Sequence, residues 1–268
     1  MKNLKRYCYG PFPSRRLGLS LGIDILPKSK LCTYNCVYCE IGQTQPINLV
    51  SPEHRIHAPP SQNFRKELTS YIKYISKLDS ITFGYNGEPT LNENMLDFLN
   101  IATEIRDEKS WLNNKPRSTL FTNSSTLYSQ EIRDKVKKFE LILAKLDVAN
   151  DDDFKRTNHP HKSAPNIETI IEALIKLKKE IPTGHKLAIQ CLIFNSNKKE
   201  FISNNTPKNI NDLAHALKKI KPDIVQVYSI ARMPAKYFVF SIDDERKKQI
   251  VNTFRDVIKD NGVDVRSY

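Results

Sequence analysis

The amino-acid sequence predicts an α/β protein in which a mainly parallel β-sheet is wrapped by helices. Short runs of β-branched and aromatic residues alternate six times with longer stretches of helical apolar spacing, which is the pattern of repeated β/α units. Right-handed crossovers leave two architectures open, a closed or partial barrel and an open doubly wound sheet. No G-x-G-x-x-G sequence follows any of the strands, which argues against a dinucleotide-binding sheet. In both architectures functional residues are expected at the carboxyl ends of the strands.

Six strands and six helices are expected to alternate along the chain. The strands are expected within residues 19–26, 80–91, 117–126, 141–149, 186–194 and 223–230, and the helices within 64–78, 93–108, 129–139, 165–181, 209–220 and 243–262. The first helix has an apolar face that includes Leu68, Ile72 and Ile75, at helical spacing. Asn92 is expected to cap the second helix. The polar stretch 150–163 is expected to be a loop, and residues 263–267 to add a terminal strand.

The composition is that of a globular protein. Apolar residues make up 39% and charged residues 27% of the 268 residues, and no run of about 18 apolar residues could cross a membrane. We expect one domain over 1–268, with residues 1–18 as an N-terminal extension and about 241–268 as a C-terminal helix and strand. The basic start has no apolar stretch behind it, so a cytoplasmic location is expected. The net charge of +12 fits a nucleic-acid partner or lysine-coated helices, and charge alone does not decide between them.

Three of the five cysteines lie within ten residues, in the order C-x-x-x-C-x-x-C. They are Cys32, Cys36 and Cys39. Soft thiolate donors favour zinc, copper(I) or iron–sulfur clusters. Structural zinc normally takes a fourth protein ligand, yet His54 and His57 lie at no usual zinc-ribbon spacing, and neither Cys8 nor Cys191 is an evident partner. An iron–sulfur cube on three cysteines leaves one iron without a protein ligand, and an open metal site can perform chemistry on a bound molecule.

This motif, with Tyr38 just before the last cysteine, resembles the defining motif of the radical S-adenosylmethionine (SAM) superfamily. In that family the three cysteines hold a [4Fe-4S] cluster whose open iron binds the amino and carboxylate groups of SAM. Reduction of the cluster then cleaves SAM to a 5′-deoxyadenosyl radical. The resemblance implies that Cys32, Cys36 and Cys39 are metal ligands and that Tyr38 lies beside the cofactor. It also implies a partial (β/α)6 TIM-like barrel, with the cluster in the loop after the first strand.

Two further segments resemble cofactor-binding motifs of the family. "NGEPT" (86–90) resembles its Gly-Gly-Glu-Pro motif, so Gly87 is expected to allow a close backbone approach and Glu88 to bind the amino group of SAM. Asn86 stands where the family has its first glycine. "LFTNSS" resembles the segment that approaches the adenosine and methionine portions, which makes Asn123 and Ser124 cofactor-binding candidates. The alternative for both segments is an ordinary turn.

In "LAKLDVA", Lys145 and Asp147 alternate with apolar neighbours, so both side chains point to one face of the strand. Two buried opposite charges are costly unless they are paired or used. The resemblance assigns Lys145 to the carboxylate of SAM and Asp147 to the ribose of SAM or to the substrate, as catalytic residues. A structural Lys–Asp pair is the alternative. Gln190 is expected to face the barrel interior and the cofactor.

The segment "YGPFPSRRLGLSLGIDILP" (9–27) completes the resemblance. Together with "CVYCEIGQT" and "GEPTL", it is similar to a poorly characterised iron–sulfur oxidoreductase branch of the superfamily, distantly related to wyosine-forming tRNA enzymes and glycyl-radical activases. Arg15 and Arg16, ahead of the first strand, are expected either to grip a phosphate, a carboxylate or SAM, or to cap the far end of the barrel. Asn158, Gln226 and Tyr228 are candidates for facing the substrate.

The function predicted is therefore a radical SAM enzyme. Its substrate is open among RNA, protein and metabolites, and its electron donor would be a protein such as flavodoxin or ferredoxin. A glycyl-radical activase or a cofactor-maturation enzyme is the alternative within the superfamily. The alternative outside it is a zinc-binding module that binds nucleic acid without catalysis.

Overall fold

A computed structural model describes residues 5–112, 114–260 and 262–268, so residues 1–4 of the predicted extension and residue 261 of the last predicted helix lie outside the described residues. Its centre is an eight-stranded sheet in the order β1-β2-β3-β4-β5-β6-β8-β10. The strands are β1 (Cys8–Ser14), β2 (Gly18–Ile23), β3 (Ser80–Phe83), β4 (Arg117–Thr122), β5 (Leu141–Lys145), β6 (Lys186–Leu192), β8 (Ile224–Tyr228) and β10 (Asp264–Ser267). Neighbouring strands from β2 to β10 are parallel, and only β1 runs antiparallel to its neighbour.

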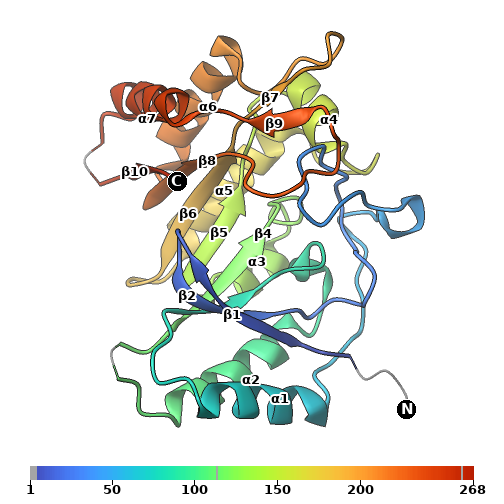
Figure 1. The fold of residues 1–268 in the computed structure, drawn as a ribbon, viewed down its shortest axis with the longest axis vertical. Coiled ribbons are helices and arrows are strands. Elements are labelled where there is room, and N and C mark those ends of the chain that lie inside the picture. Colours follow the sequence, from blue (N-terminus) through green and yellow to red (C-terminus); the bar gives the residue numbers. More distant parts are fainter. Residues whose placement is uncertain (1–4, 113, 261) are drawn as a thin grey trace.

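Helices connect the parallel strands and cover one face of the sheet (Figure 1). They are α1 (Gln62–Lys73), α2 (Met95–Asp107), α3 (Gln130–Val136), α4 (Asp151–Asn158), α5 (Ile167–Glu180), α6 (Pro207–Ile220) and α7 (Asp244–Ile258). The six predicted strands correspond to β2, β3, β4, β5, β6 and β8, and the predicted terminal strand is β10. The prediction of an α/β fold with a partial barrel is confirmed.

Alternation along the strands separates two cores. Ile142, Ile189 and Val227 belong to the large cluster that also contains the buried faces of the helices. The residues beside them in sequence point the other way and form a smaller apolar cluster on the inner face of the sheet. This cluster consists of Leu141, Leu143 and Ala188, with Leu17, Phe121 and Ile224 packed against it. Further along the same face the side chains become polar, because Lys145 pairs with Gln190 and Gln190 with Gln226 across the strands.

Three elements were absent from the prediction. Strand β1 falls in the expected N-terminal extension, and the prolines at 11 and 13 conceal it, since proline is confined to edge strands. Helix α4 falls in the expected loop 150–163. It carries three aspartates in its first turn and a cap at Asn150, so its charge pattern hides a helix with a single large apolar residue. A two-stranded sheet of β7 (Phe194–Ser196) and β9 (Val239–Ser241) lies apart from the main sheet.

Smaller differences concern element ends. The predicted strand 80–91 ends at Phe83, and Pro89–Leu91 forms a short 3-10 helix, η2, in the loop that follows it. Asn92 does not cap the second helix, because the N-cap of α2 is Asn94, whose backbone N–H donates to Asn92 Oδ1 at 2.9 Å. Among the described residues, no helix combines the length and the apolar character needed to span a bilayer.

Candidate cluster and cofactor site

The loop after β2 carries the three clustered cysteines and is fastened to the loop after β3. Leu31 N donates to Asn86 O at 3.0 Å, and Glu88 N donates to Leu31 O at 3.0 Å. Gly87 lies between these bonds with φ +134, and a Cβ on it would lie 1.7 Å from Leu31 O. The predicted close backbone approach at Gly87 is therefore an approach to the cysteine loop. Asn86, in place of the family's glycine, donates from its side chain to the carbonyls of Pro27 and Lys28 at 2.8 Å each.

Each clustered sulfur accepts a hydrogen bond from a different side-chain nitrogen. The pairs are Cys39 Sγ with Lys30 Nζ at 3.1 Å, Cys36 Sγ with Asn158 Nδ2 at 3.4 Å, and Cys32 Sγ with Asn123 Nδ2 at 3.5 Å. The three donors come from the cysteine loop itself, from the end of α4 and from the loop after β4. Hydrogen bonds to sulfur are among the factors that set the potential of a cluster bound by thiolates.

Burial favours the protonated form of the free thiols. It raises the pKa of Cys32 to about 12 and the pKa of Cys36 to about 11. Both thiols are therefore neutral near pH 7 in the metal-free protein, and metal binding must displace their protons. Cys8 and Cys191 lie in strands β1 and β6, outside the loop, and both are buried.

The donor set fits a cluster better than a single ion. A zinc ion needs its ligands to converge on one point, and among the residues that the structure describes no three His, Cys, Asp or Glu side chains form such a group. A cube of four irons instead takes one thiolate on each iron, so its ligands need not converge. Three thiols on one loop, each with its own hydrogen-bond donor, suit a cluster that leaves one iron open.

Lys145, at the end of β5, lies among two tyrosine rings and a carboxylate. Its Nζ donates to Tyr228 Oη at 2.7 Å and lies 3.5 Å from Asp147 Oδ1. The same nitrogen is 4.7 Å from the ring centroid of Tyr38. Burial lowers the pKa of Lys145, but the neighbouring Asp147 and Tyr228 outweigh burial and the net shift is upward. Lys145 is therefore a stable buried cation.

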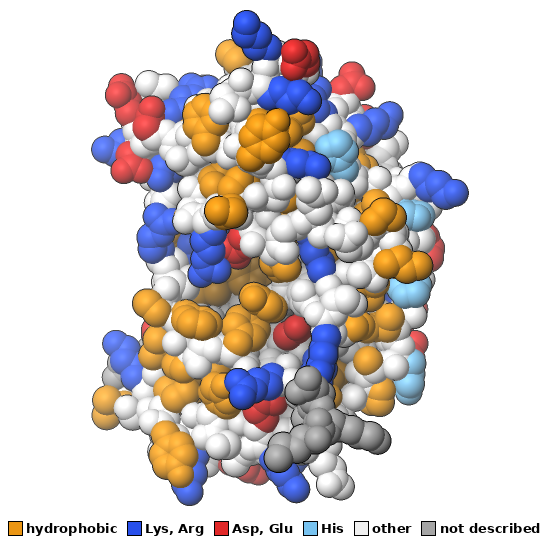
Figure 2. Space-filling view, turned by 45° about the vertical axis from the view of Figure 1, so that its right-hand side comes forward, with side chains coloured by type: hydrophobic (Ala, Val, Ile, Leu, Met, Phe, Trp, Pro, Cys, Tyr) orange, Lys and Arg blue, Asp and Glu red, His pale blue; other side chains and the backbone are white. Residues whose placement is uncertain are grey.

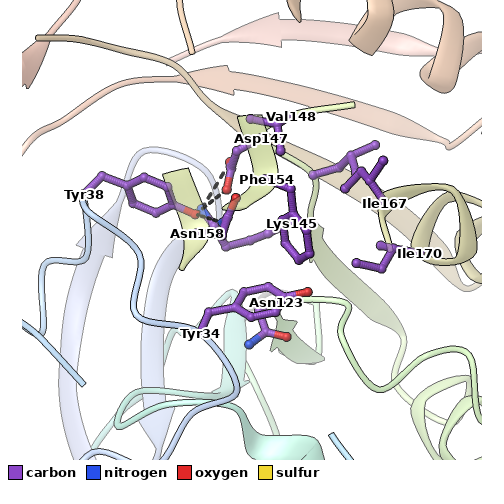
Figure 3. Close-up of a pocket in the computed structure, with 11 residues that line it drawn as sticks. Tyr34, Tyr38, Asn123, Lys145, Asp147, Val148, Phe154, Asn158, Ile167 and Ile170 are labelled. Atoms are coloured by element: carbon purple, nitrogen blue, oxygen red, sulfur yellow. Dashed lines mark hydrogen bonds and ion pairs between the residues drawn. The ribbon is translucent and has the colours of Figure 1, made fainter. Parts of the chain in front are cut away.

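Protein donors occupy the carboxylate of Asp147. Leu192 N donates to its Oδ1 at 2.7 Å, and the Tyr38 hydroxyl donates to Oδ2 (Figure 3). Asn158 Nδ2 contacts the same Tyr38 hydroxyl at 3.1 Å. Asp147 thus joins the cysteine loop, through Tyr38, to strand β6. The expected contact of Asp147 with ribose or substrate stays a prediction, and the observed contacts are those of the alternative, a structural pair with Lys145.

Glu88 is buried and joins three segments. Its Oε1 accepts from Thr90 Oγ1 at 2.7 Å and from Thr122 Oγ1 at 2.9 Å, while its Oε2 accepts from Asn123 N at 2.6 Å. Burial raises the pKa of Glu88, and these hydrogen bonds oppose that rise only in part. The expected bond from Glu88 to the amino group of SAM stays a prediction. In the structure Glu88 holds in place the loop that presents Asn123 to Cys32.

Two other predicted cofactor residues have protein partners. Ser124 Oγ donates to Lys145 O at 2.9 Å, and Ser124 has φ +72, so this serine fixes the backbone beside Lys145. Gln190 does face the inner side of the sheet, where its Nε2 donates to Gln226 Oε1 at 2.8 Å. Their roles in binding SAM are not tested by these contacts.

A pocket opens at the carboxyl ends of the strands (Figure 3). One wall is apolar, from Phe154, Ile167 and Ile170, and the rest includes the polar group around Lys145. Two lining residues, Tyr34 and Asn158, each have a buried oxygen without a hydrogen-bond partner among the described residues. Such atoms are costly unless a ligand satisfies them. SAM offers an ammonium group and ribose hydroxyls as donors, so this pocket fits it.

Sequence reasoning missed several of these residues. Tyr34 and Lys30 were not singled out, because a tyrosine between cysteines and a lysine before them have no distinctive pattern. Asn158 was named only as a candidate for facing the substrate, whereas its side chain contacts Cys36 and Tyr38.

The sheet with its thiol loop and adjoining pocket defines a barrel-type α/β protein built to bind a metal cluster beside an organic cofactor. The model of the Radical SAM superfamily matches residues 26–203, and the chain belongs to this superfamily. Its members use a [4Fe-4S] cluster and SAM. The predicted family and cofactors are thereby confirmed.

Curated relatives carry a shared name. A UPF0026 protein of Methanocaldococcus jannaschii is 28% identical over 95% of this chain and 73% of its own length. A UPF0026 protein of Helicobacter pylori is 31% identical over 84% of this chain and 64% of its own length. A protein named GTPase Obg from Brachyspira hyodysenteriae is 29% identical over 92% of this chain, but the chain spans only 33% of it. No glycine in this chain is followed by lysine, so the phosphate-binding G-K pair of P-loop GTPases is absent.

Solved structures agree on the fold. SuiB of Streptococcus suis bound to S-adenosylmethionine superposes with TM-score 0.60 at 15% identity, over 96% of this chain and 51% of SuiB. The structure described as anSMEcpe with bound AdoMet gives TM-score 0.60 at 18% identity, over 91% and 63%. TYW1 gives TM-score 0.54 at 13% identity, over 88% and 73%.

The contact of Lys30 with Cys39 leads to a prediction. Lys30→Met removes a charged donor from one sulfur, so the reduced cluster, with its extra negative charge, loses stabilisation. We expect the reduction potential to fall by on the order of 50 mV, the one-electron equivalent of about 1 kcal/mol. A redox titration followed by electron paramagnetic resonance measures it. Lys66→Met, at an exposed position of α1, is the matched control, and equal potentials in the two variants would contradict the prediction.

Proposed function

We propose that this protein is a radical SAM enzyme whose cluster is held by Cys32, Cys36 and Cys39 and which abstracts a hydrogen atom from a substrate bound on the inner face of the sheet. The observation that carries the proposal is the loop of three thiols with a separate donor to each sulfur, beside a pocket with unpartnered polar atoms. When bound, the reduced cluster supplies the electron that cleaves SAM to methionine and a 5′-deoxyadenosyl radical.

The chain's own residues would bind and orient SAM. Lys145 is a buried cation at the pocket and suits the carboxylate of SAM through a charge-assisted hydrogen bond. Asn158 Oδ1 and Tyr34 Oη, both without partners, suit its donor groups. Phe154, Ile167 and Ile170 form an apolar wall that would exclude water from the reacting centre.

Two partners complete the proposal. The cluster needs one electron for each cleavage, and a flavodoxin or ferredoxin would supply it. A reducing, cytoplasmic compartment keeps cysteines free, and all five cysteines of this chain are free.

One experiment tests the function. Protein purified without oxygen should contain about four irons per chain, and with dithionite and SAM it should release methionine and 5′-deoxyadenosine. Bound zinc with no cleavage of SAM would instead support the zinc-binding module.

A variant of Lys145 tests the proposed contact with SAM. Lys145→Met should raise the KM for SAM by about 10- to 100-fold, since a hydrogen bond to a charged group contributes about 1.5–3 kcal/mol. The assay is release of 5′-deoxyadenosine as a function of SAM concentration. Iron content should stay equal to that of the wild type, and Lys66→Met is again the control. An unchanged KM would remove Lys145 from the binding site.

A further inference from the structure

The turn between β1 and β2 enters the inner face of the sheet. Ser14 Oγ accepts from Arg16 N and Leu17 N at 3.3 Å each, which fixes the turn. Leu17 then packs against the apolar cluster at the amino-terminal half of β5, β6 and β8. The turn therefore closes the end of the inner face that lies opposite the cysteine loop.

Arg16 points from this turn toward the polar part of the inner face. Its guanidinium carbon lies 4.4 Å from the ring centroid of Tyr228, and the hydroxyl of that tyrosine contacts Lys145. Arg16, Tyr228 and Lys145 thus form a row that leads from the closed end of the inner face to the cofactor pocket. One tyrosine side chain separates the two cations.

The charge of Arg16 has no anionic partner in the described part of the chain. Its Nη1 is buried and makes no hydrogen bond to a described residue, and no carboxylate forms an ion pair with it there. The nearby amides of Gln190 and Gln226 bond to each other. Arginine stays charged at any physiological pH, and a buried donor without a partner is costly, so this position is favourable only if a ligand completes it.

Arg15, the adjacent residue, provides a contrast. It is exposed and acts outward, because after Lys247 and Lys248 it is among the groups that lower the pKa of Asp244 at the start of α7. Two consecutive arginines thus face in different directions, one toward solvent and one toward the inner face of the sheet.

We propose that Arg16 binds an oxyanion group, a carboxylate or a phosphate, at one end of a small-molecule substrate. This rests on the proposed function, because the opposite end of that substrate would reach the pocket beside Lys145. Planar guanidinium groups bind such oxyanions through paired hydrogen bonds. The turn closes the inner face behind Arg16, so the group bound there is terminal, which fits a small acid or phosphate ester rather than an internal phosphate of RNA. Basic side chains are scattered over the face drawn in Figure 2 and form no single patch there.

Anion titration tests this proposal. Inorganic phosphate and acetate are titrated separately into the anaerobically purified protein and followed by calorimetry at low ionic strength. We expect one saturable site for at least one of them, and the stronger binder identifies the substrate group. Arg16→Gln should weaken that binding at least tenfold and Arg16→Lys should restore part of it, while Arg15→Gln should stay within twofold of wild type. Equal binding by wild type and Arg16→Gln, or no binding at all, would overturn the proposal.

Two further measurements keep the outcomes separate. Cleavage of SAM without substrate should be the same in Arg16→Gln and wild type, so loss of anion binding with intact cleavage concerns this site alone. If wild type binds phosphate but does not cleave SAM, the proposed function fails and the anion site stands. A short RNA that binds tightly, depends on Arg16 and displaces phosphate would overturn the small-molecule assignment. Melting temperatures confirm folding, and Arg16→Gln should melt no lower than wild type.

Discussion

Replacing Cys32, Cys36 or Cys39 by alanine is expected to abolish both iron binding and the cleavage of SAM. Each thiolate binds a different iron of the cube, so loss of one leaves a second iron without a protein ligand and exposes the cluster to loss. The iron content should fall from about four per chain to near zero after anaerobic reconstitution. Iron analysis and release of 5′-deoxyadenosine measure the two effects.

Cys191→Ala is the matched control. Cys191 is fully buried in β6 and its neighbours are the apolar residues between sheet and helices. Removing its sulfur should cost about 1 kcal/mol of unfolding free energy by analogy with loss of one buried methyl group, and it should leave iron content unchanged. A Cys36→Ala protein that kept four irons and full cleavage would refute the assignment of the loop.

Gly87→Ala is expected to displace the cysteine loop. The new Cβ would overlap Leu31 O, at 1.7 Å, and alanine would be forced to adopt φ +134. Backbone strain and steric overlap together should lower the free energy of unfolding by about 3–5 kcal/mol. Because Leu31 directly precedes Cys32, cluster content should fall as well. Chemical denaturation and iron analysis measure these effects.

Gly184→Ala separates strain from overlap. Gly184 also has a positive φ, +91, but nothing lies within 4 Å of a Cβ placed there. This variant should lose only about 1 kcal/mol, from backbone strain, and should keep its iron. Equal losses in the two variants would show that the approach of Gly87 to Leu31 has no structural importance.

The sequence was sufficient for the sheet and the cluster ligands because both are encoded locally. Apolar alternation marks strands such as β5, and three thiols within eight positions define a metal loop without reference to the rest of the chain. Lys145 and Asp147 were also predictable, since their alternation places both on one face of the strand.

The remaining parts of the site depend on contacts between distant segments. Asn158 lies 122 residues after Cys36, and asparagine is common in loops, so nothing local distinguishes it. The direction of Arg16 follows from how the β1–β2 turn packs, and Arg15 beside it has the same chemistry. Helix α4 was missed because its aspartates stabilise the helix start by charge, while sequence patterns detect helices mainly by apolar spacing.

The position of β1 also bears on how molecules of this protein meet. An exposed strand edge offers free amide hydrogens to which a second chain can attach, and this is a common route to aggregation. Pro11 and Pro13 lack those hydrogens, so the outer side of β1 is a poor template for a further strand. The same prolines that conceal the strand in the sequence thus protect the protein from growing into a larger sheet at that border.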